Sequence, residues 1–312
     1  MSSKHISVLL NEAIDSLNIK ADGIYVDLTL GRGGHSKEIL RRIPCGHLYA
    51  FDKDEEAINE STLNLKDFDN KTIIREDFRN FKESLKSLGV EQVDGILMDL
   101  GVSSPQFDES ERGFSYKEEA RLDMRMDTRQ SLDAYQVVNT YSLSDLARIF
   151  REYGEDKFSY LIAKKIVTQR EKAPIETTTQ LVDLIKSVKP QKELLKKGHP
   201  AKQIFQALRI EVNDELGALK EALVDALQMI KVGGRVVVIT FHSLEDRIVK
   251  SAFNEVSKIE GSRHNVFSRP TIEDEPKYHL VNNKVIIPSD IEMENNPRSK
   301  SAKLRAIERS RL

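Results

Sequence analysis

The chain has 312 residues, enough for two domains of ordinary size, and its 39% hydrophobic and 31% charged residues are typical of a folded, water-soluble protein. No apolar run approaches the roughly 20 residues that cross a bilayer, the first residues lack the apolar core of a secretory signal, and the single cysteine cannot pair within the chain, so we expect a cytoplasmic protein with no membrane role. A net charge of −2 argues against binding of nucleic acid through overall positive potential, so any such binding must be local.

Short β-rich segments alternate with helical patterns between residues 24 and 100. Strands are expected at 24–28, 47–51, 71–75 and 94–100. The intervening segments that predict helices are 36–42, 55–63 and 81–88. Helices placed between strands in this way are crossover connections, so the pattern predicts an α/β fold with a parallel sheet.

The alternation then stops, and the next strong strand signal is at 235–240. About 135 residues lie between, far more than a crossover and its loops require. They predict helices, because hydroxyl residues such as Ser142 precede periodic apolar runs. We therefore expect an inserted all-helical domain at 108–205, within a sheet domain made of 1–107 and 206–312.

After the insert the chain is expected to return to the sheet. A long helix is predicted at 214–230, closed by Gly233 and Gly234, and it leads into the strand that follows. Two final strands are predicted at 278–287 and 301–308. The sheet domain is therefore completed by residues on the carboxyl side of the insert.

Charge is unevenly distributed along the chain. Between Lys157 and Arg209, twelve basic side chains stand against four acidic ones, which gives this segment a net charge of +8 and leaves −10 for the remainder. A lysine-rich helical face in contact with water has this composition, and so does an RNA-recognition module. Charge alone does not separate the two interpretations.

Glycines follow the first predicted strand. The segment from Asp27 to His35 reads DLTLGRGGH, and glycines at a strand-to-helix turn let a ligand approach the backbone. Asp52 ends the second strand 21 residues after Gly31, the spacing at which a carboxylate meets ribose hydroxyls. A tight turn followed by a helix cap would look similar, but the loop, the strand and the acid together favour a cofactor that contains adenosine.

Nicotinamide dinucleotides and S-adenosylmethionine both fit such a site. The dinucleotide fingerprint GxGxxG is incomplete here, because Ser36 stands at its last position. An acid followed by small residues at the second, fourth and sixth positions after it is typical of methyltransferases, and Asp27, Thr29, Gly31 and Gly33 match that pattern. S-adenosylmethionine is therefore the expected cofactor.

The third strand is followed by an acid and an aromatic residue, Asp77 and Phe78. Together they offer a carboxylate and a ring where the adenine of the cofactor should lie. A phenylalanine at this place is as readily part of the hydrophobic core, so the sequence leaves both roles of Phe78 open.

The fourth strand runs into DLGVSSPQ at 99–106, at the sheet edge where open α/β folds bind ligands. A turn of small residues and proline here resembles the loop of amino-methyltransferases, with Gln106 where an aromatic residue is usual. Hydroxyls and turn carbonyls can hold the N–H groups of an exocyclic amine during attack on a sulfonium methyl. Ser103, Ser104 and Pro105 are therefore the expected catalytic residues, although an ordinary β-turn has the same composition.

Three other segments carry residues with possible chemistry. Methylation of cytosine at C5 needs a covalent cysteine adduct, and Cys45 precedes the second strand, so we interpret it as structural. The segment 242–246, HSLED, is interpreted as a polar strand end in preference to a metal site. The segment 112–127 mixes Arg, Asp and Met, and predicts either an interdomain loop of paired charges or an active-site rim.

Eight segments together carry a resemblance to a known family. They are HISVLL (5–10), DLTLGRGGHS (27–36), DLGVSSPQ (99–106), ERGFS (111–115), LDMRMD (122–127), HPAKQIFQALRI (199–210), FHSLEDR (241–247) and PRSKSAKLR (297–305). Through them the chain resembles, essentially from end to end, the bacterial ribosomal RNA small subunit methyltransferase H family, also called MraW.

This resemblance implies a Rossmann-like methyltransferase sheet with an inserted helical substrate-recognition domain. It implies transfer of a methyl group from S-adenosylmethionine to N4 of a decoding-centre cytidine in 16S rRNA, within the small ribosomal subunit. The residues that match the family's cofactor contacts are Gly33, Gly34, His35, Asp52, Phe78, Asp99 and Gln106. The sequence leaves open whether the chain forms a homodimer.

A noncatalytic module that senses S-adenosylmethionine and binds a partner through its basic helices is the competing hypothesis. A sensor needs the cofactor loop but has no use for hydrogen-bond acceptors beside the methyl group. The turn at 103–105 therefore favours an enzyme over a sensor.

Overall fold

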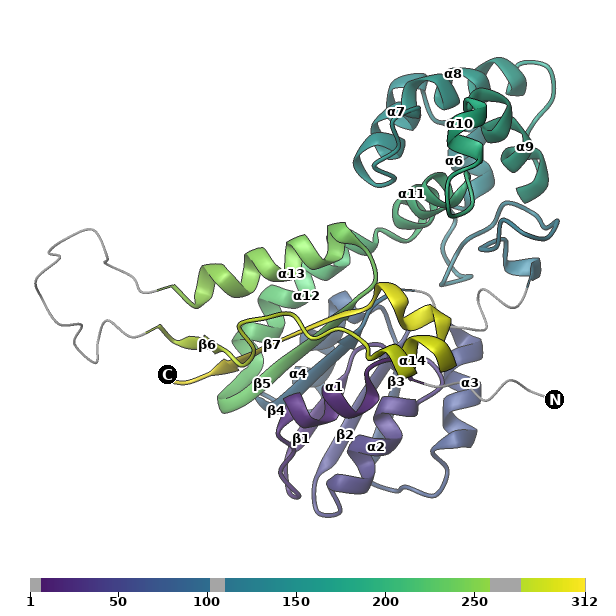
Figure 1. Ribbon diagram of the computed structural model, residues 1–312. Helices are drawn as coiled ribbons and strands as arrows, with labels where there is room; N and C mark the ends of the chain where they lie inside the picture. Colours follow the sequence, from purple (N-terminus) through teal and green to yellow (C-terminus); the bar gives the residue numbers. More distant parts are fainter. Residues whose placement is uncertain (1–6, 102–109, 259–275, 312) are drawn as a thin grey trace, which may run out of the picture. The chain divides into compact units, whose positions relative to one another are not determined.

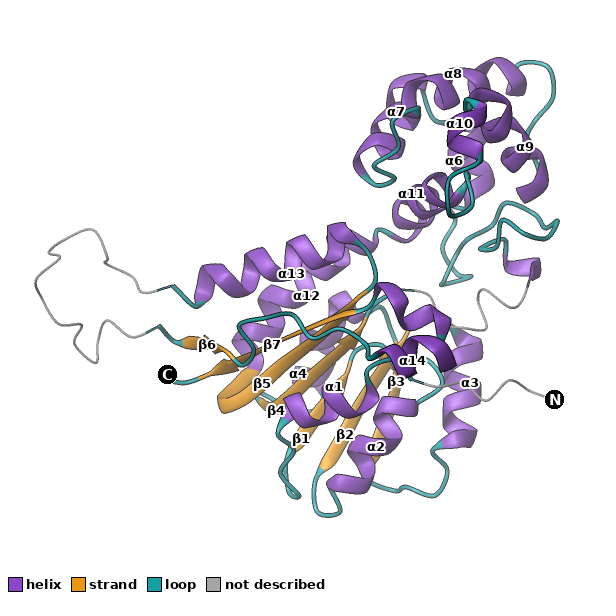
Figure 2. Cartoon of the chain, viewed as in Figure 1, coloured by secondary structure: helices purple, strands orange, loops and turns teal. Residues whose placement is uncertain are grey.

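The computed structural model describes residues 7–101, 110–258 and 276–311 (Figure 1). The chain divides into two compact units, Met1–Gly101 with Ala218–Leu312 and Val102–Gly217. The first contains a sheet with helices on both faces, and the second is helical (Figure 2). In the part of the chain that the structure describes, no helix is both long and apolar enough to cross a bilayer.

The sheet has seven strands in the order β3-β2-β1-β4-β5-β7-β6. They are β1 (Ile24–Asp27), β2 (His47–Asp52), β3 (Lys71–Arg75), β4 (Val93–Asp99), β5 (Ile230–Thr240), β6 (Tyr278–Leu280) and β7 (Lys303–Arg309). The first five are parallel, while β7 runs antiparallel to both β5 and β6. The α/β fold predicted from the alternating pattern is confirmed.

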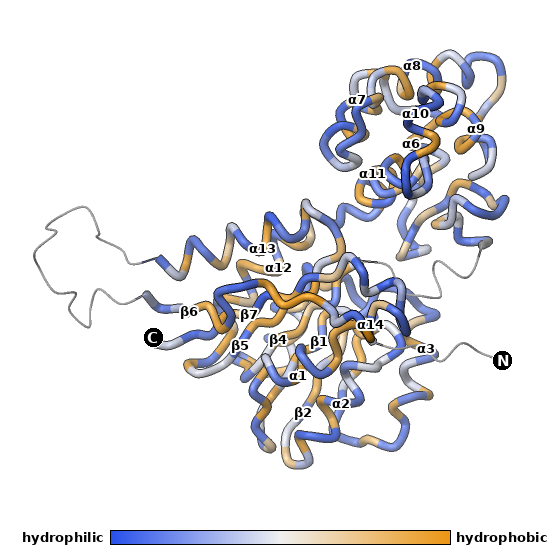
Figure 3. Tube along the Cα trace, in the orientation of Figure 1, coloured by the Kyte–Doolittle hydropathy of each residue, from blue (hydrophilic) through white to orange (hydrophobic). Residues whose placement is uncertain are grey.

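Helices cover both faces of this sheet. They are α1 (Leu10–Leu17), α2 (Gly34–Arg42), α3 (Glu55–Asn64), α4 (Phe81–Ser87), α12 (Glu215–Met229), α13 (Ser243–Val256) and α14 (Asp290–Asn295), with short 3-10 turns η1 (Phe78–Asn80) and η4 (Pro297–Ser301). Along β5, Val236 and Val238 join one hydrophobic core with α4, α12 and α13, whereas Val237 and Ile239 join the other with α1 and α2. Successive strand residues point to opposite faces, so a continuous apolar strand serves two cores. Hydrophobic stretches accordingly gather on the strands (Figure 3).

The glycine pair before the last parallel strand lies inside that strand. Helix α12 ends at Met229 and β5 begins at once, so the prediction that Gly233 and Gly234 close the helix is wrong. Gly233 has a left-handed backbone (φ +77°), and the register between β4 and β5 shifts here. A Cβ at Gly234 would lie 2.7 Å from the carbonyl oxygen of Asp94, so the glycine permits close approach of β4.

The carboxyl-terminal part of the sheet is also less regular than predicted. The strand predicted at 278–287 is limited to β6, and beyond it only an isolated bridge joins Ile286 to Leu304 among the described residues. Strand β7 covers the last predicted strand and continues to Arg309.

The helical unit has its own hydrophobic core. Its elements are η2 (Ser110–Arg112), α6 (Ala134–Thr140), α7 (Leu143–Glu152), α8 (Ser159–Arg170), α9 (Thr178–Val188), α10 (Gln191–Leu194) and α11 (Lys202–Asn213). Ser142 caps α7, and Thr177 with Gln180 forms a capping box on α9, as hydroxyl residues at these starts predict. The unit extends beyond the predicted insert, 108–205, because Leu208 and Val212 of α11 lie in its core.

The two neighbouring glycines are expected to respond differently to replacement. Gly233→Ala should cost about 1–2 kcal/mol because its backbone is left-handed, and Gly233→Asn should recover much of that loss, since asparagine tolerates this conformation. Gly234→Ala should cost about 1–3 kcal/mol through contact with β4, and Gly234→Asn should be no better. Urea unfolding of the four variants measures this. A Gly234→Asn protein more stable than Gly234→Ala would contradict the close-approach explanation.

Candidate functional site

The candidate site lies where the parallel strands end. A buried carboxylate, Asp27, closes β1, and its two oxygens accept hydrogen bonds from the Ser36 hydroxyl at 2.6 Å and from the Thr29 N–H at 3.1 Å. Burial raises the pKa of Asp27, and these hydrogen bonds act in the opposite direction. The Thr29 hydroxyl in turn accepts from the backbone N–H of Asp99, 2.6 Å away. Asp27 therefore connects β1 and α2, and Thr29 connects the same loop to the end of β4.

The glycines of the loop fit where larger residues would not. Gly33 has a left-handed backbone (φ +77°) and forms the N-cap of α2. A Cβ at Gly34 would lie 1.9 Å from the hydroxyl oxygen of Ser7, and one at Gly33 would lie 3.2 Å from the Leu65 side chain. The close packing of Ser7 and Leu65 therefore explains why this loop carries glycines at these two positions.

Asp52 ends β2 and faces the glycine loop. Its carboxylate accepts from the N–H of Gly31 and from the N–H of Asp54, both at 2.9 Å. Burial is the largest influence and raises the pKa of Asp52 to about 6, although the two N–H groups act in the opposite direction. Each oxygen keeps a further lone pair, so the carboxylate can hold the loop and still accept hydrogen bonds from a ligand.

His35 and Asp99, which both match the family's cofactor contacts, lie next to each other. His35 is buried, its Nε2 lies 3.1 Å from the carbonyl oxygen of Val8, and its Nδ1 lies 3.6 Å from Asp99 Oδ2. Burial, followed by the negative charges of Asp27 and Glu245, holds the pKa of Asp99 well above its ordinary range. The other oxygen, Oδ1, is buried and has no hydrogen-bond partner among the described residues. An unsatisfied buried acceptor at a sheet edge fits a ligand that donates hydrogen bonds.

The two phenylalanines after β3 have different environments. Phe81 is fully buried and packs edge-to-face against Phe51, with ring centroids 6.5 Å apart. Phe78 is only partly buried against the same core. Beside it, Asp77 pairs with the buried Lys53 at 3.1 Å. Phe78 therefore contributes to the core and keeps an exposed part, whereas Phe81 is core alone.

Glu245 is a residue of this region whose role the sequence did not indicate. It is 2% exposed, and its carboxylate accepts from the N–H groups of Phe241 and His242 at 2.7 and 3.2 Å. His242 is the N-cap of α13, so the segment 242–246 begins a helix and its interpretation as a strand end is wrong. A capping residue followed three positions later by Glu is the signal that could have found this.

Several other predicted residues do not enter this cluster. Ser103, Ser104, Pro105 and Gln106 lie outside the described residues. Cys45 is exposed in the turn before β2. It therefore lies at the amino ends of the parallel strands, whereas the candidate site lies at their carboxyl ends.

The segment 112–127 shows the predicted pairing of charges. Arg125 contacts Asp123 at 2.7 Å, and Arg121 contacts Asp133 at the same distance. Its backbone is further held by Asn213, which accepts from Met126 N–H at 2.8 Å. These contacts agree with the loop interpretation of this segment.

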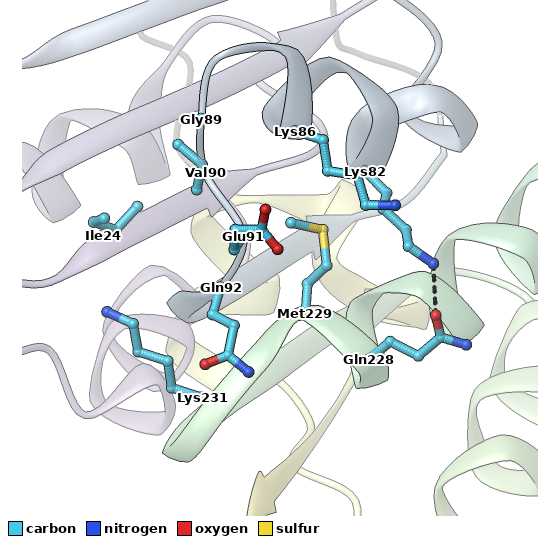
Figure 4. Close-up of a pocket in the computed structure, with 10 residues that line it drawn as sticks. All are labelled: Ile24, Lys82, Lys86, Gly89, Val90, Glu91, Gln92, Gln228, Met229 and Lys231. Atoms are coloured by element: carbon cyan, nitrogen blue, oxygen red, sulfur yellow. Dashed lines mark hydrogen bonds between the residues drawn. The ribbon is translucent and has the colours of Figure 1, made fainter.

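A cavity of about 730 Å³ lies at the opposite ends of the strands, where β4 and β5 begin (Figure 4). Its lysines are already occupied: Lys82 Nζ donates to Gln228 at 2.5 Å (Figure 4). The same ammonium group lies 2.7 Å from Asp225. Lys231 pairs with Asp94 at 2.7 Å. Because it lies at the amino ends of the strands, this cavity is separate from the candidate site.

The pKa of Asp52 can be checked directly. We expect NMR titration of a ¹³C-labelled carboxyl group to give a pKa of about 6. Asp54→Asn should lower it, because the charge of Asp54 raises the pKa of its neighbour. Since the folded pKa is the higher one, the folded protein binds more protons between about pH 4 and 6, and this group's contribution to stability decreases as pH rises through that interval. A wild-type value near 4 would refute the burial argument.

A model of the MraW methylase family matches residues 2–310. Solved structures that resemble the chain include an rRNA methylase from Streptococcus thermophilus, at 12% identity and a TM-score of 0.45, with 98% of this chain and 99% of that one covered. Another is a candidate methyltransferase from Streptococcus mutans in complex with SAH, at 11% identity, the same TM-score and the same coverage. Because the family model spans nearly all of the sequence, the resemblance is confirmed and the chain belongs to the MraW methylase family.

Proposed function

We propose that the protein methylates N4 of a decoding-centre cytidine in 16S rRNA, within the small ribosomal subunit. Membership of a methylase family makes the chain a methyltransferase that uses S-adenosylmethionine. The observation that carries the proposal is the cluster of Asp52, Asp99 and the glycine loop at the strand ends. The finer assignment, to N4 of cytidine in this RNA, is supported by the eight family segments of the sequence.

The residues at the strand ends fit S-adenosylmethionine. The unsatisfied Oδ1 of Asp99 suits the ammonium group of its methionine part, and the remaining lone pairs of Asp52 suit ribose hydroxyls. Gly33 and Gly34 belong to the loop that Asp52 holds through the Gly31 N–H, and the exposed part of Phe78 suits the adenine. When bound, S-adenosylmethionine supplies a methyl group activated by a positive sulfur.

The amine of cytidine needs acceptors for its N–H groups, because its lone pair is delocalised into the ring. We assign this part to the turn after β4, where Ser103 and Ser104 hydroxyls or the turn carbonyls accept from the amine and hold it in position. Methylation of a ring carbon would need a covalent nucleophile. Cys45 lies at the amino ends of the strands, away from the candidate site, so it does not supply this nucleophile. This supports direct transfer to an amine.

We assign RNA recognition to the helical unit. Some of its basic groups have structural roles: Arg170 donates to the carbonyl groups of Val138 and Tyr141, and Arg209 pairs with Glu215 at 2.7 Å. Many of its other basic residues are exposed lysines, for which no ion pair is found among the described residues: Lys157, Lys164, Lys165, Lys172, Lys186, Lys192, Lys197 and Lys202. Such a surface suits the phosphates of RNA.

Loss of the Asp52 carboxylate should weaken cofactor binding. Asp52→Ala removes a charged acceptor, and we expect the affinity for S-adenosylmethionine to fall about 10- to 150-fold, measured by calorimetry. Asp67→Ala is the matched control, because Asp67 is an exposed carboxylate in the turn after α3. A folded Asp52→Ala protein with wild-type affinity would remove Asp52 from the cofactor site.

The chemistry can be tested on small ribosomal subunits isolated without this methylation. Mass spectrometry of the nucleosides should identify N4-methylcytidine, and Cys45→Ala should remain active. Ser104→Ala or Pro105→Ala should lower turnover more than it weakens cofactor binding. A product identified as 5-methylcytidine, or a folded but inactive Cys45→Ala enzyme, would overturn the mechanism.

A further inference from the structure

Two aromatic rings far apart in sequence stack on each other in the helical unit. Tyr116 and His199 are nearly parallel, with an interplanar angle of 12° and ring centroids 4.3 Å apart. The tyrosine ring also meets Phe205 of the core edge-to-face, at 5.7 Å. The stack is therefore held against the hydrophobic core of this unit.

The loop that carries His199 is fixed by a buried ion pair. Lys189, at the end of α9, contacts Asp156 at 2.5 Å, and their side chains are 6% and 1% exposed. The same ammonium group donates to the carbonyl oxygen of Pro200 at 2.7 Å. The position of the histidine ring is thus set on one side by the stack and on the other by this contact.

The orientation of the imidazole leaves one donor available. Its Nδ1 accepts from the N–H of Ala201 at 3.2 Å, so the neutral ring carries its proton on Nε2. Within the described residues, no acceptor for this N–H is found. Packing against Tyr116 alone would not require a ring with a free donor.

Two lysines add positive charge around the ring. Lys117 and Lys186 are exposed and form no ion pair within the described part of the chain. Burial lowers the pKa of His199, and Lys186, Lys117 and Lys189 lower it further, which shows that their charges reach the ring. At neutral pH the site therefore combines an uncharged N–H donor with two unpaired ammonium groups.

We propose that Tyr116, His199, Lys117 and Lys186 form a docking site for a phosphodiester group of the RNA substrate, called the His199 site. An oxyanion accepts from the fixed Nε2–H and is neutralised by the two lysines, while Tyr116 holds the ring in place. The site rests on the proposed function, because RNA is its ligand. Its contribution is to substrate affinity, with no part in the methyl transfer itself.

The test uses the full-length protein and a transcript of the 16S rRNA decoding region, with binding followed by fluorescence anisotropy over a series of salt concentrations. His199→Phe keeps the stacked ring and removes the donor, and should lower affinity about tenfold. Lys117→Gln with Lys186→Gln should flatten the slope of log affinity against log salt, by about 0.7 for each phosphate of single-stranded RNA that the two lysines neutralise. Lys250→Gln, which changes an exposed lysine of α13 in the sheet unit, is the matched control.

Methylation kinetics with unmethylated small subunits complete the test. The His199-site variants should raise KM for the subunit and leave kcat and cofactor affinity unchanged. If the wild type methylates RNA but these variants match Lys250→Gln in affinity, slope and KM, the His199 site is refuted and the proposed function stands. A lower kcat at unchanged KM also refutes it. If the wild type neither binds nor methylates the RNA, the proposed function fails and the site fails with it.

Discussion

The geometry of the candidate site depends on a carboxylate that is buried at the end of β1. Asp27 is 1% exposed, and water cannot satisfy its oxygens, so the Ser36 hydroxyl and the Thr29 N–H must do so. These two contacts set where α2 begins and how the glycine loop leaves the strand. Through the Thr29 hydroxyl, the same loop also fixes the backbone of Asp99. One desolvated group therefore determines the relative positions of the groups in the candidate site.

Negative charge is concentrated at the carboxyl ends of the strands, and this affects which ligand the candidate site suits. Asp99 is close enough to Asp27 and Glu245 for both charges to raise its pKa, and the pKa of Asp52 is raised by its own burial. Carboxyl groups crowded in this way favour bound protons or a bound cation, since either reduces their repulsion. S-adenosylmethionine carries positive charge on both its sulfur and its ammonium group. The acidic edge thus suits this cofactor better than it suits a polyphosphate such as a dinucleotide.

Much of the candidate site could be predicted from the sequence, because the residues that form it follow one another closely along the chain. Asp27, Gly31 and Asp52 are recognised by spacing along a strand, a turn and the next strand. The prediction for Gly233 and Gly234 is wrong, because a glycine pair after a helix is ordinarily a cap, and only the approach of β4 shows why the strand needs them. The same limit applies to the stacked pair of Tyr116 and His199, whose contact depends on the packing of the whole helical unit.

The basic segment 157–209 belongs to the helical unit, whereas the acidic cluster belongs to the sheet unit, and this separates two requirements that conflict within one site. RNA is a polyanion, and an acidic cluster that suits a cationic cofactor repels it. In the proposed function, lysines in a unit with its own core supply RNA affinity from residues other than the carboxylates at the strand ends. The sheet tolerates such an insertion between β4 and β5, since these strands pair directly over most of their length. Their register is set by backbone hydrogen bonds and alternating valines, so it does not depend on the length of the connection between them.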